Sequence, residues 1–183
     1  MPATCLITSG LTADCSNAVG GIQAIWLADY LDLIADSTTV VAARVISVVP
    51  ATTVYGYSFR PENAGLDISI MTDATQGTTH HEQTLSARFN FVDNDLLDKF
   101  TKIAYARPIV FAQDRNEQVF LLGARNGCTI TDARSSVGRA FADGNGLDVT
   151  FTAREPETYF LTASAGPGTA NYPFDAVTGI TVG

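Results

Sequence analysis

The sequence predicts a mainly β fold, a β-sandwich or barrel of antiparallel strands with one flanking helix at about 94–107. β-Branched and aromatic residues recur in short runs separated by Gly, Asn, Asp and Pro, the composition of strands and turns. Only one segment spaces its apolar residues like a helix. The chain has 183 residues, 46% hydrophobic and 16% charged, which suits one domain of ordinary size. We therefore expect a single domain over 1–183.

Upstream of the helix, several segments are typical of strands. A turn at Gly20 and Gly21 leads into an apolar strand at 22–27. Residues 40–49 form a strand that is apolar on both faces, and 53–59 an aromatic-rich strand. We interpret 50–65 as a hairpin that ends in a turn-rich loop.

Two further segments alternate apolar and polar residues. Leu66, Ile68 and Ile70 alternate with polar residues over 66–73, and the pattern repeats over 79–92 with Leu85, Ala87, Phe89 and Phe91 on one face. Such alternation indicates one face packed on a core and one face in water. We expect these strands to be neighbours joined through 74–78.

The helix has clear start and stop signals. Asp93 and Asn94 offer an N-cap, and Pro108 stops the helix. Its expected apolar face is formed by Leu96, Leu97, Phe100, Ile103 and Ala104.

Short strands follow the helix. Residues 109–112 and 118–122 predict a hairpin, a tight turn at 143–146 leads into a strand at 147–153, and 159–164 is another strand. The ends are expected to be extended docking arms, at about 1–20 and 164–183.

The charge is unevenly distributed. Residues 1–98 hold 11 acids and 3 bases, whereas 99–183 hold 8 of each, so the whole formal charge of −8 lies in the first part. A protein that binds nucleic acid tightly needs clustered cations, so this class is disfavoured. No apolar run approaches the ~20 residues of a membrane span, and the start lacks the pattern of a signal peptide.

The sequence contains no recognisable catalytic or metal site. Adjacent His80 and His81 point to opposite faces of a strand and cannot chelate one ion together. Cys5, Cys15 and Cys128 lack metal spacing, so we interpret them as free thiols, with a Cys5–Cys15 bridge as the alternative. We expect no cofactor, no metal and no enzymatic activity.

Three stretches resemble structural proteins of tailed bacteriophages. The first is 11–30, with Cys15 followed by Gly20-Gly21-Ile22; the second is the Leu-Gly turn at 121–127; the third is 138–156, where an Asp-Gly-Asn-Gly turn precedes Leu-Asp-Val-Thr-Phe-Thr. The third resembles the major tail tube proteins, from which this chain departs at Asp148 and at 154–156.

The resemblance implies a structural virion protein with no enzymatic role. Its copies would form homohexameric rings that stack helically into a tail tube, a conduit through which DNA passes without specific binding. The implied partners are other copies of itself, the tail terminator, tape-measure and distal tail or baseplate proteins, and in some tails a sheath. The implied location is the virion tail, assembled in the host cytoplasm, with no membrane contact.

Within that hypothesis, the polar face of 66–73 and 79–92 would line the channel. Its residues are Asp67, Ser69, Asp73, Glu82, Thr84, Ser86, Arg88 and Asn90. Arg88 interrupts the acidic character, and we expect it to pair with Asp67 or Glu82. The alternative is that this face meets external solvent.

Contacts between subunits and rings are expected from the 50–65 hairpin, the loop at 125–138 and the two arms. The residues chosen are Tyr55, Tyr57, Phe59, Arg60, Arg125, Arg134, Arg139, Tyr172 and Phe174, because Tyr and Arg are enriched at interfaces. The alternative is that the aromatic residues pack on the subunit's own core.

Other classes remain open. A capsid decoration protein, a tail terminator or another β-rich ring protein would share the acidic and site-free character. A carbohydrate-binding module would need exposed aromatic residues on a flat face, yet the single Trp, Trp26, lies in an apolar strand. A small metal-dependent enzyme would need ligands beyond His80 and His81.

Overall fold

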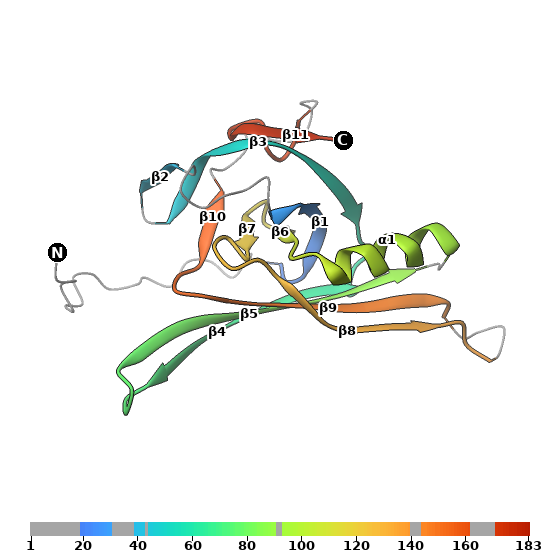
Figure 1. The fold of residues 1–183 in the computed structure, drawn as a ribbon. Helices are drawn as coiled ribbons and strands as arrows, with labels where there is room; N and C mark the ends of the chain where they lie inside the picture. Colours follow the sequence, from blue (N-terminus) through green and yellow to red (C-terminus); the bar gives the residue numbers. More distant parts are fainter. Residues whose placement is uncertain (1–18, 31–38, 43, 91–92, 140–143, 162–170) are drawn as a thin grey trace.

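The computed structural model describes residues 19–30, 39–42, 44–90, 93–139, 144–161 and 171–183. The predicted fold class is confirmed: the chain is mainly β, with two sheets in separate layers and a helix at one end of them (Figure 1).

The first sheet curls into a nearly closed barrel. Its path runs β1 (Ile22–Ala28), β6 (Ile109–Asp114), β7 (Val119–Leu122), β10 (Tyr159–Leu161) and β3 (Val45–Ser58), and β3 pairs back with β1. Two more strands, β2 (Thr39–Ala42) and β11 (Thr178–Val182), have β3 as their one strand partner among the described residues. Closure leaves the five barrel strands with partners on both sides.

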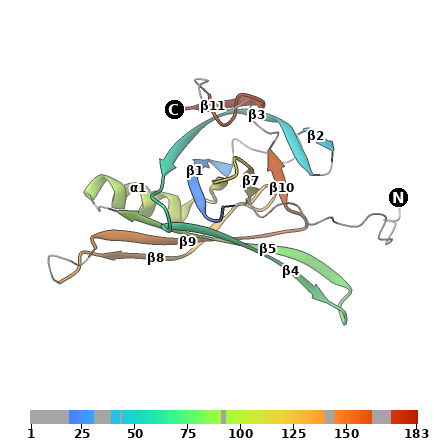
Figure 2. The ribbon, with the colours of Figure 1, turned by 180° about the vertical axis from the view of Figure 1, so that it is seen from behind.

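The second sheet is open and antiparallel. Its order is β4 (Ala64–Asp73), β5 (Thr78–Asn90), β9 (Gly146–Glu155) and β8 (Thr129–Ser136). It lies across the barrel, and α1 (Asn94–Tyr105) fills the space between the two layers at one end (Figures 1 and 2).

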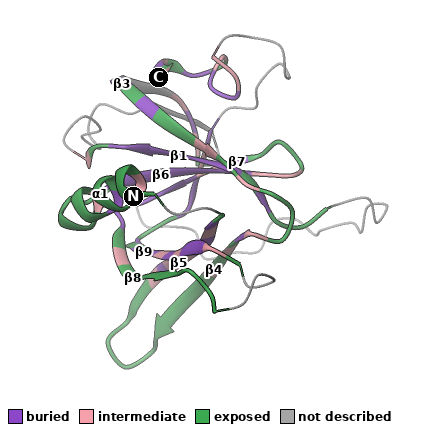
Figure 3. Cartoon of the chain, turned by 90° about the vertical axis from the view of Figure 1, so that its right-hand side faces the viewer, coloured by how far each residue is buried: buried purple, intermediate pink, exposed green. Residues whose placement is uncertain are grey.

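Two hydrophobic cores share the barrel strands. Ala24 and Trp26 of β1 belong to the core inside the barrel, whereas Ile25 and Leu27 belong to the core between the barrel and the open sheet. Strands β6 and β7 divide their side chains in the same way. This double burial explains the continuous apolar runs in these strands, and Figure 3 shows β1 and β6 as buried.

Aromatic rings fill the barrel. Phe174 packs edge-on against Trp26 and Phe111, with ring centroids 5.1 and 5.3 Å apart. Gly56 lies opposite Trp26 in the β1–β3 pairing, and a Cβ at Gly56 would come within 2.7 Å of the indole nitrogen. Glycine is therefore required where the indole crosses β3.

The predicted helix start is confirmed. The Asp93 side chain accepts a hydrogen bond of 2.7 Å from the Leu96 N–H and caps the helix. The helix ends at Tyr105, two residues earlier than expected. Phe100 is buried and Leu96 and Ile103 are half-buried, but Leu97 and Ala104 are exposed because the open sheet and barrel cover only one side of the helix.

The strand predictions are confirmed in part. Strands β4 and β5 are antiparallel neighbours, and β6 and β7 form the expected hairpin. Strands are also found at the segments expected at 22–27, 147–153 and 159–164, although the last ends at Leu161. Phe91 and Asp143, the first residue of the expected tight turn at 143–146, lie outside the described residues.

The predicted hairpin at 50–65 is wrong. Residues 45–58 form one continuous strand, β3, which crosses from β2 and β10 to β1, and the chain then enters β4 of the other sheet. The expected break between 49 and 53 is absent because β11 pairs in parallel with β3 at this point.

The loop expected at 125–138 and the C-terminal arm also differ from the prediction. Residues 129–136 form β8, paired with β9. The last part of the arm, 171–183, docks on its own chain through β11, and residues 162–170 lie outside the described part. So do residues 1–18 of the N-terminal arm, with Cys5 and Cys15.

Candidate assembly surface

The open sheet has one face on which Met71 is the one large apolar side chain among the described residues of β4 and β5. The register aligns Asp67 with Thr84 and Ser69 with Glu82, so all eight residues predicted to line a channel lie on one face, away from the core. The neighbouring strand continues this face with Asp148, Thr150, Thr152 and Arg154.

Sequence reasoning missed the contribution of β8 and β9. The alternation of apolar and polar residues at 147–153 predicts a strand with one solvent-exposed face, but it does not reveal that β9 is the direct neighbour of β5. The edge strand β8 adds Asp132 and Arg134, and the Thr131 hydroxyl lies 3.2 Å from the Thr152 hydroxyl. The complete face carries five Asp or Glu and three Arg, a formal charge of 3 − 5 = −2.

Two ion pairs cross the centre of this face. Arg88 lies 3.4 Å from Asp148, and Arg154 lies 3.2 Å from Glu82. The predicted pairing of Arg88 with Asp67 or Glu82 is therefore wrong, because β9 places an acid directly opposite Arg88 and a base directly opposite Glu82. Both arginines of the two central strands are occupied by carboxylates.

The two edges of the open sheet differ in charge. Among the described residues, β4 and β8 each have only one strand partner in this sheet. The segment 61–77, which contains β4, holds three acids and no base. Strand β8 itself holds Asp132 and Arg134, and the residues before and after it add Arg125 and Arg139, so that 125–139 holds three bases and one acid. Arg107 and Arg154 add positive charge beside β8, around a hollow that Thr129 and Thr131 also line.

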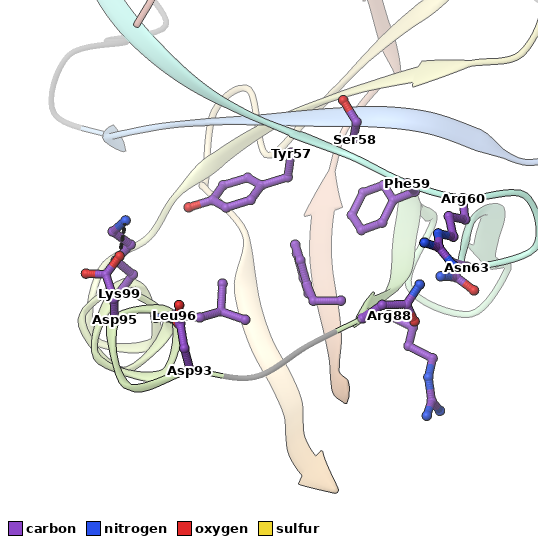
Figure 4. A pocket seen from close by; sticks show the side chains of 12 residues that line it. Tyr57, Ser58, Phe59, Arg60, Asn63, Arg88, Asp93, Asp95, Leu96 and Lys99 are labelled. Atoms are coloured by element: carbon purple, nitrogen blue, oxygen red, sulfur yellow. Dashed lines mark hydrogen bonds and ion pairs between the residues drawn. The ribbon is translucent and has the colours of Figure 1, made fainter. Parts of the chain in front are cut away.

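The predicted contact residues of 55–60 separate into two groups. Tyr55 is exposed on β3, whereas Tyr57 and Phe59 are half-buried and pack edge-on against Phe89 at 5.5 and 5.1 Å. Together with Arg60 they line a cleft of about 390 Å³ beside α1 (Figure 4). Tyr57 and Phe59 thus contribute mainly to the chain's own core.

The remaining predicted contacts also separate. Arg125, Arg134 and Arg139 are exposed. Tyr172 is half-buried, and its hydroxyl accepts a 2.8 Å hydrogen bond from Gln113. Phe174 is fully buried inside the barrel and has no surface to offer a neighbour.

A buried carboxylate connects the two sheets. Glu155 of β9 accepts hydrogen bonds from the backbone N–H groups of Arg125 and Asn126, at 3.0 and 2.8 Å, in the connection from β7 to β8. Burial raises the pKa of Glu155, and these two hydrogen bonds lower it in part. Its second oxygen has no hydrogen-bond partner among the described residues. Burial likewise raises the pKa of the nearby Cys128 thiol.

The histidines lie on opposite faces of β5. His81 is buried, and its Nδ1 lies 3.1 Å from the Thr158 hydroxyl, while His80 is half-buried. Within the described residues, no three His, Cys, Asp or Glu side chains are grouped to hold a metal ion. No helix of the described chain is long and apolar enough to cross a membrane.

Comparison with protein-family models, with curated proteins and with solved structures finds no match for this chain.

Proposed function

We propose that this chain is a structural subunit whose copies form rings and stack into a tube, as the resemblance to phage tail tube proteins implies. The observation that carries the proposal is the open sheet. It combines a polar outer face with two edges that have no further strand partner among the described residues and that lie in segments of opposite net charge.

The strand directions suit side-by-side association. Each neighbour in the open sheet is antiparallel, so β4 and β8 run in opposite directions. When copies are related by rotation, β8 of one lies antiparallel to β4 of the next. The free backbone N–H and C=O groups of these two edge strands can then pair with each other. The net positive charge of 125–139 in one copy also attracts the net negative charge of 61–77 in the next.

The polar face suits the wall of a DNA conduit. A surface that binds DNA needs cations free to contact phosphate. Here Arg88 and Arg154 are paired with Asp148 and Glu82, and the face carries a net negative charge. Hydroxyl groups and paired charges allow DNA to pass without being held, which is the function we propose for this face.

The proposed setting follows from the resemblance. The subunit would act in the virion tail, contacting terminator, tape-measure and distal tail proteins at the ends and interior of the tube. Capsid decoration and tail-terminator proteins are the alternatives, and they differ in the particles they form.

Negative-stain microscopy of the purified chain tests the proposal. We expect long hollow cylinders or stacked rings. Isolated single rings would favour a terminator, and trimers a decoration protein. A monomer at all concentrations would contradict the proposal.

Charge reversal at the two edges tests the mode of association. Asp67→Arg and Arg134→Glu should each reduce ring formation, because each places like charges at the junction. The double variant Asp67→Arg/Arg134→Glu should recover part of the lost ring formation, because opposite charges face each other again. Glu117→Lys, in the exposed β6–β7 turn, is the control and should assemble like the original chain.

A further inference from the structure

The end of the β4–β5 hairpin projects beyond the barrel as a ribbon, residues 66–83 (Figures 1 and 2). On its inner face, opposite the proposed channel face, β4 presents an apolar stripe of Leu66, Ile68 and Ile70, because alternate residues of a strand share a side. Leu66 and Ile68 are half-buried, whereas Ile70 is 65% exposed. A hairpin is marginal in water by itself, so this stripe favours a segment that covers it.

A hollow of about 420 Å³ lies where the stripe meets the barrel. Leu66 and Ile68 line it from the open sheet, and Phe120 of β7 lines it from the barrel. Phe120 is half-buried and packs against the half-buried ring of Phe160 in β10, with ring centroids 5.0 Å apart. Both sheets therefore contribute apolar side chains at this end of the molecule.

The N-terminal arm, residues 1–18, joins the described fold at this hollow. Val19 is one of the lining residues and is 57% exposed. The Asn116 side chain binds the Val19 backbone twice: its Oδ1 accepts a 3.0 Å hydrogen bond from the Val19 N–H, and its Nδ2 donates a 3.0 Å hydrogen bond to the Val19 carbonyl. The point from which the arm starts is therefore fixed beside Leu66 and Ile68.

The sequence of the arm suits an apolar stripe. Asp14 is the only charged side chain in 1–18. Apolar and polar residues alternate over 11–16, with Leu11, Ala13 and Cys15 at the apolar positions and Thr12, Asp14 and Ser16 at the polar ones. In an extended segment the three apolar side chains share one side, at a spacing of about 6.6 Å. Leu66, Ile68 and Ile70 have the same two-residue spacing in β4.

The arm can also reach the whole stripe of its own chain. The eight residues from Val19 back to Leu11 span up to about 26 Å when extended, whereas Leu66 and Ile70 are about 13 Å apart along β4. Two other segments outside the described residues fit less well. Residues 162–170 contain no large apolar side chain, and residues 31–38 follow the opposite end of β1.

We propose that residues 11–16 lie along the inner face of the ribbon of their own chain, with Leu11 against Ile70 and Cys15 nearer the hollow. Docking removes the stripe from water and leaves Thr12, Asp14 and Ser16 on the solvent side. It also supports the projecting end of β4. This inference is independent of the proposed tube, because it concerns a contact within one chain.

Photo-crosslinking of the dilute chain under reducing conditions tests the contact. Ile70→p-benzoylphenylalanine places a photoreactive ring on the inner face, and we expect cross-links to residues 11–15, located by mass spectrometry. The same probe at Met71 is the matched control, because Met71 is the next residue, is 47% exposed and lies on the opposite face. It should not give that product.

An equal mixture with isotope-labelled chain identifies which copy supplies the arm. We expect each cross-linked product to carry the label of one chain only. Products that combine both labels would overturn the assignment to the chain's own ribbon. Cross-links from position 70 to 31–38 or 162–170, or the same product from positions 70 and 71, would overturn the contact itself. So would the absence of any product from position 70.

A pair of substitutions tests the side of the arm that docks. Leu11→Asp and Thr12→Asp each add one acid to the arm, but only position 11 belongs to the proposed apolar side. Leu11→Asp should reduce the yield of the cross-link from position 70 about tenfold, because it removes a buried apolar side chain, whereas Thr12→Asp should leave it nearly unchanged.

Amide hydrogen exchange gives a measurement without the probe. Exchange over 66–73 should be faster in the Leu11→Asp variant than in the Thr12→Asp variant, because the ribbon loses its cover. Equal exchange and equal cross-link yields in the two variants would contradict the proposal.

Discussion

The barrel and the open sheet use similar strands in opposite ways. The barrel strands have partners on both sides, and several are buried on both faces. The open sheet has two edges with no further partner among the described residues, and one of its faces is wet. The barrel strands therefore leave no edge for another strand, whereas the open sheet has two edges at which we propose that copies meet.

The largest effect is expected inside the barrel. Phe174→Ala should lower the free energy of unfolding of the unassembled chain by about 3–5 kcal/mol, because it removes a buried ring packed on Trp26 and Phe111. Thr84→Ala on the wet face is the control and should change it by less than about 0.5 kcal/mol. Denaturant titration measures both. If both variants lose the same free energy of unfolding, the barrel interior does not contribute more to stability than the exposed face of the open sheet.

A smaller effect is expected at the junction of the two sheets. Glu155→Ala leaves the N–H groups of Arg125 and Asn126 without their acceptor and should cost about 1–3 kcal/mol in denaturant unfolding. Glu155→Gln keeps an acceptor oxygen and should cost less. If both variants lose the same stability, the hydrogen bonds are not the cause.

Glu155 also predicts a dependence on pH. Its pKa is raised in the folded state by burial, so the folded chain binds the proton more tightly than the unfolded chain. This stabilisation is complete below about pH 4.3, the unfolded value, and is lost as the pH rises through the folded value. The difference in stability between the original chain and Glu155→Gln should therefore shift against the original chain as pH rises. A constant difference would show that Glu155 does not titrate in this way.

The helix cap should contribute less. Asp93→Ala removes the acceptor of the Leu96 N–H and should cost about 1 kcal/mol. Asp93→Asn retains an acceptor oxygen and serves as the control. A loss as large as that of Phe174→Ala would indicate that the helix end is part of the main core.

The smallest effect is expected on the wet face. Arg88 and Asp148 are both partly exposed, so a double-mutant cycle should give a coupling of only about 0.2–1 kcal/mol in the unassembled chain. Asp148→Ala combined with Glu82→Ala should nevertheless increase DNA retention at low salt, because it frees Arg88 and Arg154. Unchanged retention would contradict the role we assign to the two ion pairs.

Local patterns were sufficient where a segment's own residues decide its structure. The alternation in 66–73 and 79–92 predicted adjacent strands with one polar face, and Asp93 predicted the helix start. The partner of Arg88 could not be predicted, because it comes from β9, 60 residues away in the sequence. Phe174 was assigned to a surface because a Gly- and Pro-rich context does not reveal that the segment folds back into the barrel.

The sequence by itself determined the fold class, the helix and the polar face of β4 and β5, since each depends on residue spacing within one segment. Only the tertiary structure decided that β3 is one strand shared by several partners, that Arg88 and Arg154 are neutralised across β5 and β9, and that β4 and β8 lie at the two edges of the open sheet. These features depend on which distant segments become neighbours, and spacing along the chain carries no information about that pairing.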